Sequence, residues 1–328
     1  YMAVLTDRFG RQFPYLRLSL LEACNFHCSY CLPNGYRARE GQSRWLSREE
    51  ITRLLRAFTA VGLRTLRLTG GEPSLRSDLT DIIADAAGMP GLETIAMTSN
   101  GILLPRKIAE WQAAGLTAIN VSVDSLDRSR FHAITGHDRF DTVMEGVEMA
   151  LRLPFKAVKL NAVLLHGLND DELPTWLAFL RTRRISIRFI ELMQTGDNRD
   201  YFQRHHLPAA TLQQQLTAMG WQLQKRAPEA GPALEYAHSD YAGRIGIIAP
   251  YSKDFCVGCN RLRVTATGDL RLCLFGEFGI NLRPLLQDDA QQSELIERLR
   301  GQLGLKAAGH DLANGNTGLT PHLASIGG

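Results

Sequence analysis

The sequence predicts a mixed α/β fold, which we interpret as an incomplete TIM-like barrel of six β/α units with a smaller C-terminal α+β domain. Two observations predict the barrel: strand-like and helical segments alternate six times along the chain, and the connections between them are short. A third observation predicts the additional domain, because this alternation ends near residue 194. We therefore expect a partial barrel over residues 1–232 and a C-terminal region over residues 233–328.

The strand-like segments of the barrel are short and apolar, or alternate between apolar and polar residues. They cover residues 15–20, 65–69, 94–98, 118–123, 158–164 and 185–191. Polar residues and glycines follow the carboxyl ends of these segments, where the active sites of barrel enzymes lie. Because there are six units instead of the usual eight, we expect a barrel that is open on one side.

The first predicted helix has a clear start signal. Ser47 and Glu50 have the spacing of a capping box, apolar residues repeat at helical spacing from Ile51 to Phe58, and Gly62 ends the pattern. Apolar spacing predicts further helices around residues 79–86, 108–115, 143–151, 176–180 and 212–219, and another helix that runs through Phe131. The remaining predicted elements are strand-like pieces at 221–223, 234–236 and 245–248, a hairpin turn at 267–268 and a polar helix over 288–303.

The composition is that of a soluble globular protein, with 45% apolar and 22% charged residues. A formal net charge of +3 argues against a dedicated nucleic-acid-binding protein, although it permits local basic sites for a small anion. No apolar run is long enough to span a bilayer, and the N-terminus lacks the apolar region of a signal peptide. We therefore expect a cytoplasmic protein that is not inserted in a membrane.

Six cysteines fall into two sets of three, separated by more than two hundred residues without another cysteine. The first set is Cys24, Cys28 and Cys31, spaced CxxxCxxC directly after the first strand-like segment. Three thiolates leave one metal position open, and a [4Fe–4S] cluster held in this way would have one iron free for another ligand. The alternative is structural zinc, which normally has four protein ligands and would need His27 or a distant residue. A reducing cytoplasm disfavours a disulfide framework.

The second set is Cys256, Cys259 and Cys273, and it also leaves one position of a metal centre without a cysteine ligand. Arg261 and Arg263 are alternate residues and therefore lie on one face of a strand. Guanidinium groups suit triphosphate oxygens and purine edges better than the ammonium of lysine does. The pattern favours a metal centre beside a nucleotide, with a structural zinc ribbon as the alternative.

The run Gly70-Gly71-Glu72-Pro73 ends the second strand-like segment. Glycines permit close approach of a ligand to the backbone, and Glu72 could accept hydrogen bonds from a cationic ligand amine; a tight turn is the alternative. Together with CxxxCxxC and Tyr30, this run resembles the radical S-adenosylmethionine (SAM) superfamily. The resemblance implies a [4Fe–4S] cluster whose open iron binds the amino and carboxylate groups of SAM, and reductive cleavage of SAM to a 5′-deoxyadenosyl radical.

Further segments narrow the resemblance: residues 190–193 (IELM), 254–256 (DFC), 259–263 (CNRLR) and the terminal 325–328 (SIGG). With them, the chain is similar over essentially its full length to the GTP 3′,8-cyclase family, which catalyses the first step of molybdenum cofactor biosynthesis. The resemblance implies a lyase that removes the ribose 3′ hydrogen of GTP and forms (8S)-3′,8-cyclo-7,8-dihydro-GTP. It also implies two [4Fe–4S] clusters, an electron donor, cyclic pyranopterin monophosphate synthase as the next enzyme, and a monomer or homodimer.

The resemblance also implies roles for individual residues. The first cluster would be held by Cys24, Cys28 and Cys31, and the terminal residues Gly327 and Gly328 would assist radical initiation. SAM would lie against Tyr30, Gly71, Ser122 and Met193. The second cluster would be held by Cys256, Cys259 and Cys273. GTP would be bound by Arg17, Arg67, Thr98, Lys159, Arg261, Arg263 and the backbone at Leu262. Arg188 is an additional candidate, whose alternative is an ion pair with a nearby carboxylate.

A few residues differ from the family pattern or have no role in it. Ala23 and His27 replace residues that are common in the family, but neither position is a ligand, so we expect local effects only. His205 and His206 are expected on a polar loop without a metal. Two rival functions remain: a radical SAM enzyme that acts on a peptide, and a non-enzymatic zinc-binding interaction protein.

Overall fold

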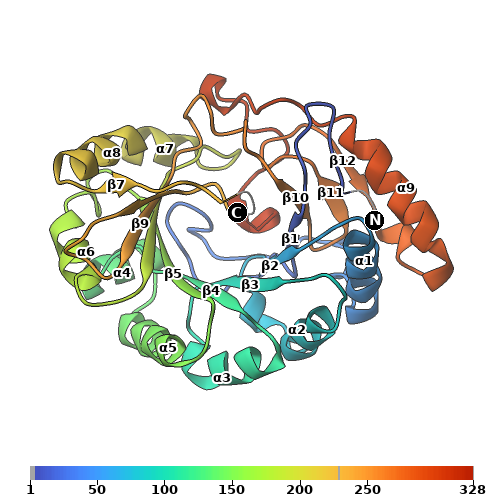
Figure 1. The fold of residues 1–328 in the computed structure, drawn as a ribbon, viewed down its shortest axis with the longest axis horizontal. Coiled ribbons are helices and arrows are strands. Elements are labelled where there is room, and N and C mark those ends of the chain that lie inside the picture. Colours follow the sequence, from blue (N-terminus) through green and yellow to red (C-terminus); the bar gives the residue numbers. More distant parts are fainter. Residues whose placement is uncertain (1–3, 228–229, 328) are drawn as a thin grey trace.

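A computed structural model describes residues 4–227 and 230–327 (Figure 1). Its central strands are parallel neighbours in chain order: β1 (Tyr15–Ser19), β2 (Thr65–Thr69), β3 (Thr94–Ser99), β4 (Ala118–Ser122), β5 (Ala157–Leu164) and β6 (Ser186–Glu191). The predicted mixed α/β fold with a mainly parallel sheet is therefore confirmed. Each strand lies within one residue of the bounds expected from the sequence.

Strands from the C-terminal part of the chain extend this sheet at both edges. β9 (Arg244–Ile248) pairs in parallel with β6, and β10 (Arg261–Val264) pairs in parallel with β1. The outer strands are antiparallel: β8 (Leu234–Ala237) and β7 (Gln222–Leu223) follow β9, whereas β11 (Asp269–Arg271) and β12 (Gly279–Asn281) follow β10. In the described residues, the sheet has 12 strands in the order β12-β11-β10-β1-β2-β3-β4-β5-β6-β9-β8-β7. Strands on both sides of residue 232 thus belong to one sheet.

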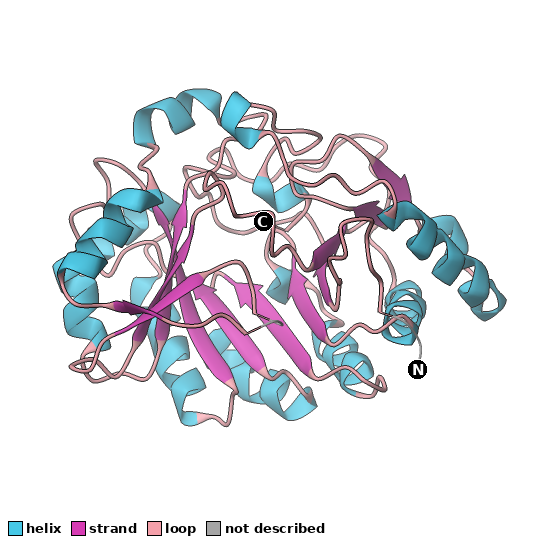
Figure 2. Ribbon diagram, turned by 45° about the horizontal axis from the view of Figure 1, so that its top comes forward, coloured by secondary structure: helices cyan, strands magenta, loops and turns pink. Residues whose placement is uncertain are grey.

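Helices surround the outer face of the curved sheet, as Figure 1 and Figure 2 show. The helices that connect the central strands are α1 (Arg48–Ala60), α2 (Leu79–Ala87), α3 (Leu104–Ala114), α4 (Arg128–Thr135), α5 (Phe140–Arg152) and α6 (Leu173–Leu180). Such helical crossovers are what parallel neighbouring strands require. Within the described part of the chain, no helix has the length and apolar character needed to cross a membrane.

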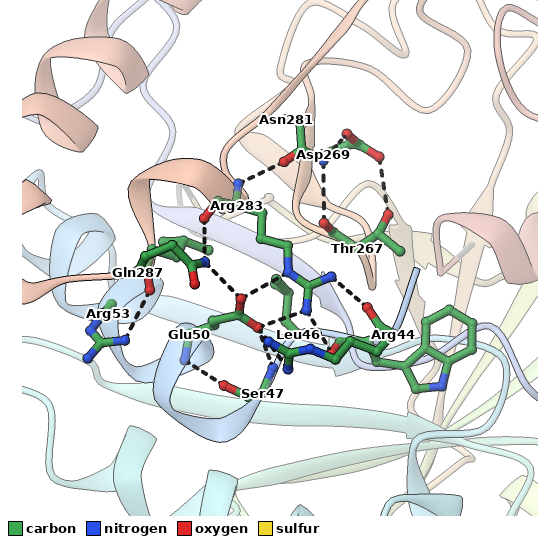
Figure 3. Close-up of polar contacts among 12 residues, drawn as sticks. Arg44, Leu46, Ser47, Glu50, Arg53, Thr267, Asp269, Asn281, Arg283 and Gln287 are labelled. Atoms are coloured by element: carbon green, nitrogen blue, oxygen red, sulfur yellow. Dashed lines mark hydrogen bonds and ion pairs between the residues drawn. The ribbon is translucent and has the colours of Figure 1, made fainter. Parts of the chain in front are cut away.

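The start of α1 also fastens the C-terminal segment to the rest of the molecule (Figure 3). The predicted capping box is present, since Glu50 N–H donates to Ser47 Oγ and Ser47 N–H donates to the Glu50 carboxylate. That buried carboxylate also accepts hydrogen bonds from Arg283 Nε and Gln287 Nε2, each at 2.9 Å (Figure 3). Burial alone raises the pKa of Glu50, but the hydrogen bonds from Arg283 and Gln287 lower it to about 2.

The later helices agree with the predictions only in part. The described residues of this part contain α7 (Arg199–His205), α8 (Ala209–Ala218) and α9 (Gln292–Leu303). The predicted polar helix is present: Asp288 caps a short 3₁₀ turn over Asp289–Gln291, and α9 continues from Gln292 to Leu303. His205 is the last residue of α7, so the loop prediction is wrong for it, whereas His206 follows the helix in extended conformation. The sequence did not indicate α7 because none of its side chains is buried, so no apolar periodicity marks it.

Candidate functional site

The alternation of side chains along the strands separates the core from the site. On β1, Leu16 and Leu18 are fully buried in the core cluster that packs under the helices, whereas Tyr15 and Arg17 line a cavity. The parallel register places Arg17 opposite Arg67 on one side and opposite Arg263 on the other. Strands from both ends of the chain thus place arginines side by side on one face of the sheet.

The first of two adjoining cavities holds the first cysteine set. Its lining includes every residue that the resemblance assigned to the first cluster and to SAM: Cys24, Cys28, Cys31, Tyr30, Gly71, Ser122 and Met193. These residues come from the loop after β1 and from the carboxyl ends of β2, β4 and β6. The structure therefore brings together a set that spans about half of the sequence.

Gly71 lets the turn after β2 approach the cysteine loop closely. Gly71 N–H donates to the Leu21 carbonyl at 2.8 Å, and the next N–H, from Glu72, donates to the Ala23 carbonyl at 2.8 Å. A Cβ at Gly71 would lie 2.2 Å from the Ala23 carbonyl oxygen, which is shorter than any tolerable contact. The glycine is therefore required for backbone packing beside Cys24, whether or not a ligand is bound.

Glu72 joins the loops at the ends of β2 and β3. Its buried carboxylate accepts hydrogen bonds from Ser99 Oγ at 2.8 Å and from the backbone N–H groups of Asn100 at 2.6 Å and Ser74 at 3.1 Å. Burial raises the pKa of Glu72, although these donors oppose the effect. The sequence predicted only a possible contact with a ligand amine and missed this structural role.

Asp124 is a residue of the first cavity that the sequence analysis did not assign. Its carboxylate accepts a hydrogen bond from Tyr30 OH at 2.9 Å and another from Val163 N–H at 2.9 Å. Burial raises the pKa of Asp124 to about 6. Its position directly after the fourth strand-like segment was the available signal, because polar residues at strand ends line the sites of such folds. With Glu72, Asp124 gives this cavity an acidic character that suits a cationic ligand.

The thiol groups of the first set are close enough to influence one another. Burial raises the pKa of Cys24 to about 12 and of Cys31 to about 11, and it raises the pKa of Cys28 well above the ordinary value. The six cysteines of the chain form no disulfide. Within residues 4–227 and 230–327, no group of His, Cys, Asp and Glu is arranged to hold a single metal ion. Cys24, Cys28 and Cys31 nevertheless line one cavity, and three thiolates with one open position are a ligand set that suits a [4Fe–4S] cluster.

The second cavity holds the second cysteine set and most of the predicted nucleotide ligands. Its lining includes Cys256, Cys259, Cys273, Arg17, Arg67, Thr98, Arg188, Arg261 and Arg263. Thr98, Asn161, Ile190 and Met193 line both cavities. The two cysteine sets therefore face adjoining spaces inside one sheet.

The second cavity concentrates positive charge. Burial, and then the neighbouring charge of Arg261, lowers the pKa of Arg263 to about 10. Arg17 Nη2 and Arg263 Nη1 both donate to the Gly327 carbonyl, at 3.1 and 3.2 Å. Arg67 Nε donates to Tyr15 OH at 2.6 Å. Such a group of buried cations is an electrostatic site for an anion.

Lys159 and Leu262 are absent from the lining of the second cavity, whereas Arg188 is part of it. Lys159 lines a separate hollow instead, and burial with the charge of Arg188 lowers its pKa to about 8. The Leu262 side chain lies in the core, which agrees with a backbone role alone. Gly327 lies beside Thr69, and Gly328 is outside the described residues. Arg188 donates to Glu235 at 3.1 Å, the ion pair that was the alternative to its ligand role.

Tyr15 and Lys306 were missed by the sequence analysis. Tyr15 lies two residues before Arg17 on the same strand face, so the alternation rule could have found it. Its burial raises its pKa, but the charges of Arg67 and Arg17 and the hydrogen bond from Arg67 lower the value to about 7. Lys306 is buried and donates to the Leu272 carbonyl, beside the second cysteine set. No local pattern marks Lys306, because its neighbours come from distant parts of the chain.

The chain resembles several known proteins. Residues 18–180 match the family model of the radical SAM superfamily, and residues 185–312 match that of Molybdenum Cofactor Synthesis C. The chain is 64% identical over 327 residues to a curated protein named GTP 3′,8-cyclase from Stenotrophomonas maltophilia (strain K279a), with 100% of both chains covered. It is 55% identical to a protein of the same name from Shewanella denitrificans, covering 100% of this chain and 97% of that relative.

Solved structures with little sequence similarity share the fold. SuiB of Streptococcus suis, bound to S-adenosylmethionine, has a TM-score of 0.63 to this chain at 13% identity. The match covers 89% of this chain and 67% of SuiB. At this level of identity the likeness concerns the fold alone.

Proposed function

The chain belongs to the GTP 3′,8-cyclase family, and from this membership we propose that it converts GTP to (8S)-3′,8-cyclo-7,8-dihydro-GTP in the first step of molybdenum cofactor biosynthesis. The observation that carries the proposal is the pair of adjoining cavities. Each is lined by three cysteines, one is acidic and the other basic, and four residues line both. This arrangement suits a cationic cofactor that must react with an anionic substrate beside it.

In the first cavity, Cys24, Cys28 and Cys31 would hold a [4Fe–4S] cluster. When bound, this cluster would supply the electron that cleaves SAM to a 5′-deoxyadenosyl radical. Tyr30, Gly71, Ser122 and Met193 would lie against SAM, as the resemblance implies. The carboxylates of Glu72 and Asp124 support this assignment, because the ammonium and sulfonium groups of SAM are positive.

In the second cavity, Cys256, Cys259 and Cys273 would hold the second cluster and leave one position open toward the base of GTP. The nucleotide would be bound by Arg17, Arg67, Thr98, Lys159, Arg261, Arg263 and the backbone at Leu262. Guanidinium groups make paired hydrogen bonds to phosphate oxygens, so the cluster of arginines supports binding of a triphosphate. Thr98 and Met193, which line both cavities, would lie where cofactor and ribose meet.

The proposed reaction removes the ribose 3′ hydrogen and joins that carbon to C8 of the guanine, before reduction and protonation complete the product. Positioning is the main task of the protein, because a reactive radical must be held against one hydrogen. The Gly327 carbonyl, held by Arg17 and Arg263, supports a role of the C-terminal tail in radical initiation. Gly328 would share that role.

The proposal extends to the division of the chain into two regions and to the partners of the protein. We interpret the sheet as an open six-unit barrel over residues 1–232, with residues 233–328 as the region that carries the second cluster. The product would pass to cyclic pyranopterin monophosphate synthase, and an electron donor would reduce the first cluster. We expect the enzyme in the cytoplasm, as a monomer or homodimer.

Deuterium transfer tests the proposal directly. Enzyme reconstituted with iron and sulfide without oxygen would be given SAM, reductant and GTP deuterated at the ribose 3′ carbon. We expect deuterium in the 5′-deoxyadenosine, measured by mass spectrometry, and about eight irons per chain, the content of two cubane clusters. Unlabelled 5′-deoxyadenosine would rule out 3′ hydrogen removal. Tightly bound zinc without iron would instead favour the zinc-binding interaction protein.

A further inference from the structure

Arg188 lines the second cavity, but a carboxylate outside that cavity holds its side chain. Arg188 Nη2 donates to Glu235 Oε1 at 3.1 Å. Glu235 is not among the described residues that line the second cavity, and it lines the separate hollow that also contains Lys159. As seen from the second cavity, the Glu235 carboxylate therefore lies behind the Arg188 guanidinium.

The register of the sheet lets this ion pair form across an intervening strand. Arg188 on β6 and Glu235 on β8 are both paired with Gly246 of β9, which lies between them. A Cβ at Gly246 would lie 3.2 Å from Arg188 Cγ and 3.7 Å from Glu235 Oε1. Because the glycine has no side chain, the two side chains can meet over it. They are only 10% and 26% exposed, so the pair is well shielded from solvent.

The three nitrogens of the Arg188 guanidinium have different surroundings. Nη2 is held by Glu235, and Nε is enclosed by the protein, so neither is offered to a ligand. Nη1 is not one of the enclosed atoms and has no acceptor among the described residues. It lies 3.5 Å from the position of a Cβ at Gly231, which also lines the second cavity. Nη1 is therefore the donor that faces the cavity.

Arg188 lies at the end of the second cavity that is farther from the cysteines. It is on β6, whereas Arg263 is on β10, and the strands β1 to β5 lie between these two in the sheet. Burial lowers the pKa of Arg188, the charge of Glu235 raises it and that of Arg67 lowers it again. Cys273, by contrast, raises the pKa of Arg263. With the guanine base beside the second cysteine set, the phosphates of GTP would extend toward Arg188.

We propose that Glu235 is a positioning residue, which holds the Arg188 guanidinium so that Nη1 donates to a phosphate oxygen of GTP. The inference rests on the proposed binding of GTP in the second cavity. A guanidinium has five N–H donors, so Arg188 can bind a phosphate while it keeps its ion pair with Glu235. A side chain that is already fixed loses less conformational entropy when the ligand binds, which favours binding.

Two substitutions of Glu235 separate its hydrogen bond from its charge. Glu235→Gln keeps a side-chain oxygen that can accept from Arg188 Nη2 but carries no charge. Glu235→Ala removes the acceptor as well. Arg188→Met removes the guanidinium, so the double variant R188M/E235A shows whether Glu235 acts through Arg188. In this double-mutant cycle neither charge of the pair is left without its partner in the double variant.

The test measures equilibrium binding of GTP, inorganic tripolyphosphate and SAM to the reconstituted wild-type and variant enzymes without oxygen, with iron content determined for each. We expect E235A to bind GTP and tripolyphosphate about tenfold more weakly, the effect of one misplaced hydrogen bond to a charged group. E235Q should recover most of this loss, and E235A should have no further effect in R188M. SAM affinity should stay the same, because Arg188 is not among the described residues that line the first cavity.

Each contrary result has a distinct meaning. Unchanged tripolyphosphate affinity in E235A would overturn the role of Glu235 but leave the proposed function standing. Tighter binding to both E235A and E235Q would show that Glu235 opposes the phosphates through its charge, which contradicts positioning. An equal loss in E235A and E235Q, a loss that persists in R188M, or a parallel loss of SAM affinity would also contradict it. Wild-type enzyme with both clusters that failed to bind GTP would overturn the proposed function, and this inference with it.

Discussion

The two cysteine sets have the same number of thiols but lie among opposite charges. Beside the first set, burial and the carboxylate of Glu72 raise the pKa of Cys24, and burial and Asp124 raise that of Cys28. Beside the second set, burial alone would raise the pKa of Cys259, but the positive charges of Lys306 and Arg261 lower it. The first environment favours a cationic ligand and the second an anionic one. The three cysteines of each set therefore do not by themselves determine which ligand binds beside them. The charges of the surrounding side chains do.

The two sets also differ in how they are held together. The first lies on one loop, and the turn at Gly71 packs directly on its backbone. The second is assembled from distant segments: Arg11 donates to the Cys256 carbonyl at 3.1 Å and also to the carbonyls of Ala307 and Ala308, each at 2.7 Å. The first set should therefore depend on local backbone packing, and the second on contacts between the two ends of the chain.

The largest expected difference between the two sets is in SAM cleavage when one cysteine of each set is replaced. Cys28→Ser should reduce SAM cleavage by at least about a thousandfold, the scale seen when an essential group is removed. Cys256→Ser should retain SAM cleavage but form no cyclised product, because only the substrate side is disrupted. Both variants should lose about half of the roughly eight irons of the wild type. Chromatography of 5′-deoxyadenosine and product, with iron analysis, measures these outcomes. If both variants lost SAM cleavage to the same extent, the division of roles would be wrong.

Substitution of one glycine beside each cysteine set by alanine should affect the stability of the two sites differently. In Gly71→Ala, the new Cβ would lie 2.2 Å from the Ala23 carbonyl oxygen, whereas in Gly309→Ala it would lie in ordinary contact with Cys256 at 3.5 Å. We expect a loss of about 1–3 kcal/mol in unfolding free energy for Gly71→Ala, typical of overpacking. Gly309→Ala, the matched control, should stay within about 0.5 kcal/mol. Denaturant unfolding of the two proteins compares them, and equal losses would contradict the packing argument.

The last expected effect concerns the contact that holds the C-terminal segment to α1, and it depends on pH. The pKa of Glu50 is lowered from 4.5 to about 2 in the folded protein. Its stabilisation is therefore fully present above the unfolded pKa of 4.5 and is lost as the pH falls toward 2. Glu50→Gln should lower the free energy of unfolding by about 2–3 kcal/mol at pH 7, and the difference from wild type should shrink as the pH falls below 4.5.

Glu49→Gln is the control for this pair of measurements, because Glu49 is the exposed neighbour on the same helix. Its effect on the unfolding free energy should be much smaller than that of Glu50→Gln, because the charge of an exposed side chain is screened by solvent. Urea unfolding at pH 7, 5 and 4 would test both variants. A difference between Glu50→Gln and wild type that did not change with pH would show that the Glu50 carboxylate is not the source of the stabilisation.

Much of the fold could be predicted because its signals are local. The six central strands, the capping box of Ser47 and Glu50 and the hairpin after β10 all depend on residues a few positions apart. The helix α7 was missed because it buries no side chain and leaves no periodicity to detect. Among site residues, Asp124 and Tyr15 carried weak local signals, whereas Lys306 carried none, because its neighbours lie far away in the chain.

The sequence by itself determined the secondary structure of the sheet, the two cysteine sets and the membership of the GTP 3′,8-cyclase family. Spacing and alternation are properties of short segments, so they can be recognised without knowing what packs against those segments. Only the tertiary structure decided that β9 and β10 extend opposite edges of one sheet. It also decided that one cysteine set lies among carboxylates and the other among buried cations. Strand pairing and burial bring these groups together, and the energy of a charge depends on the neighbours that folding supplies.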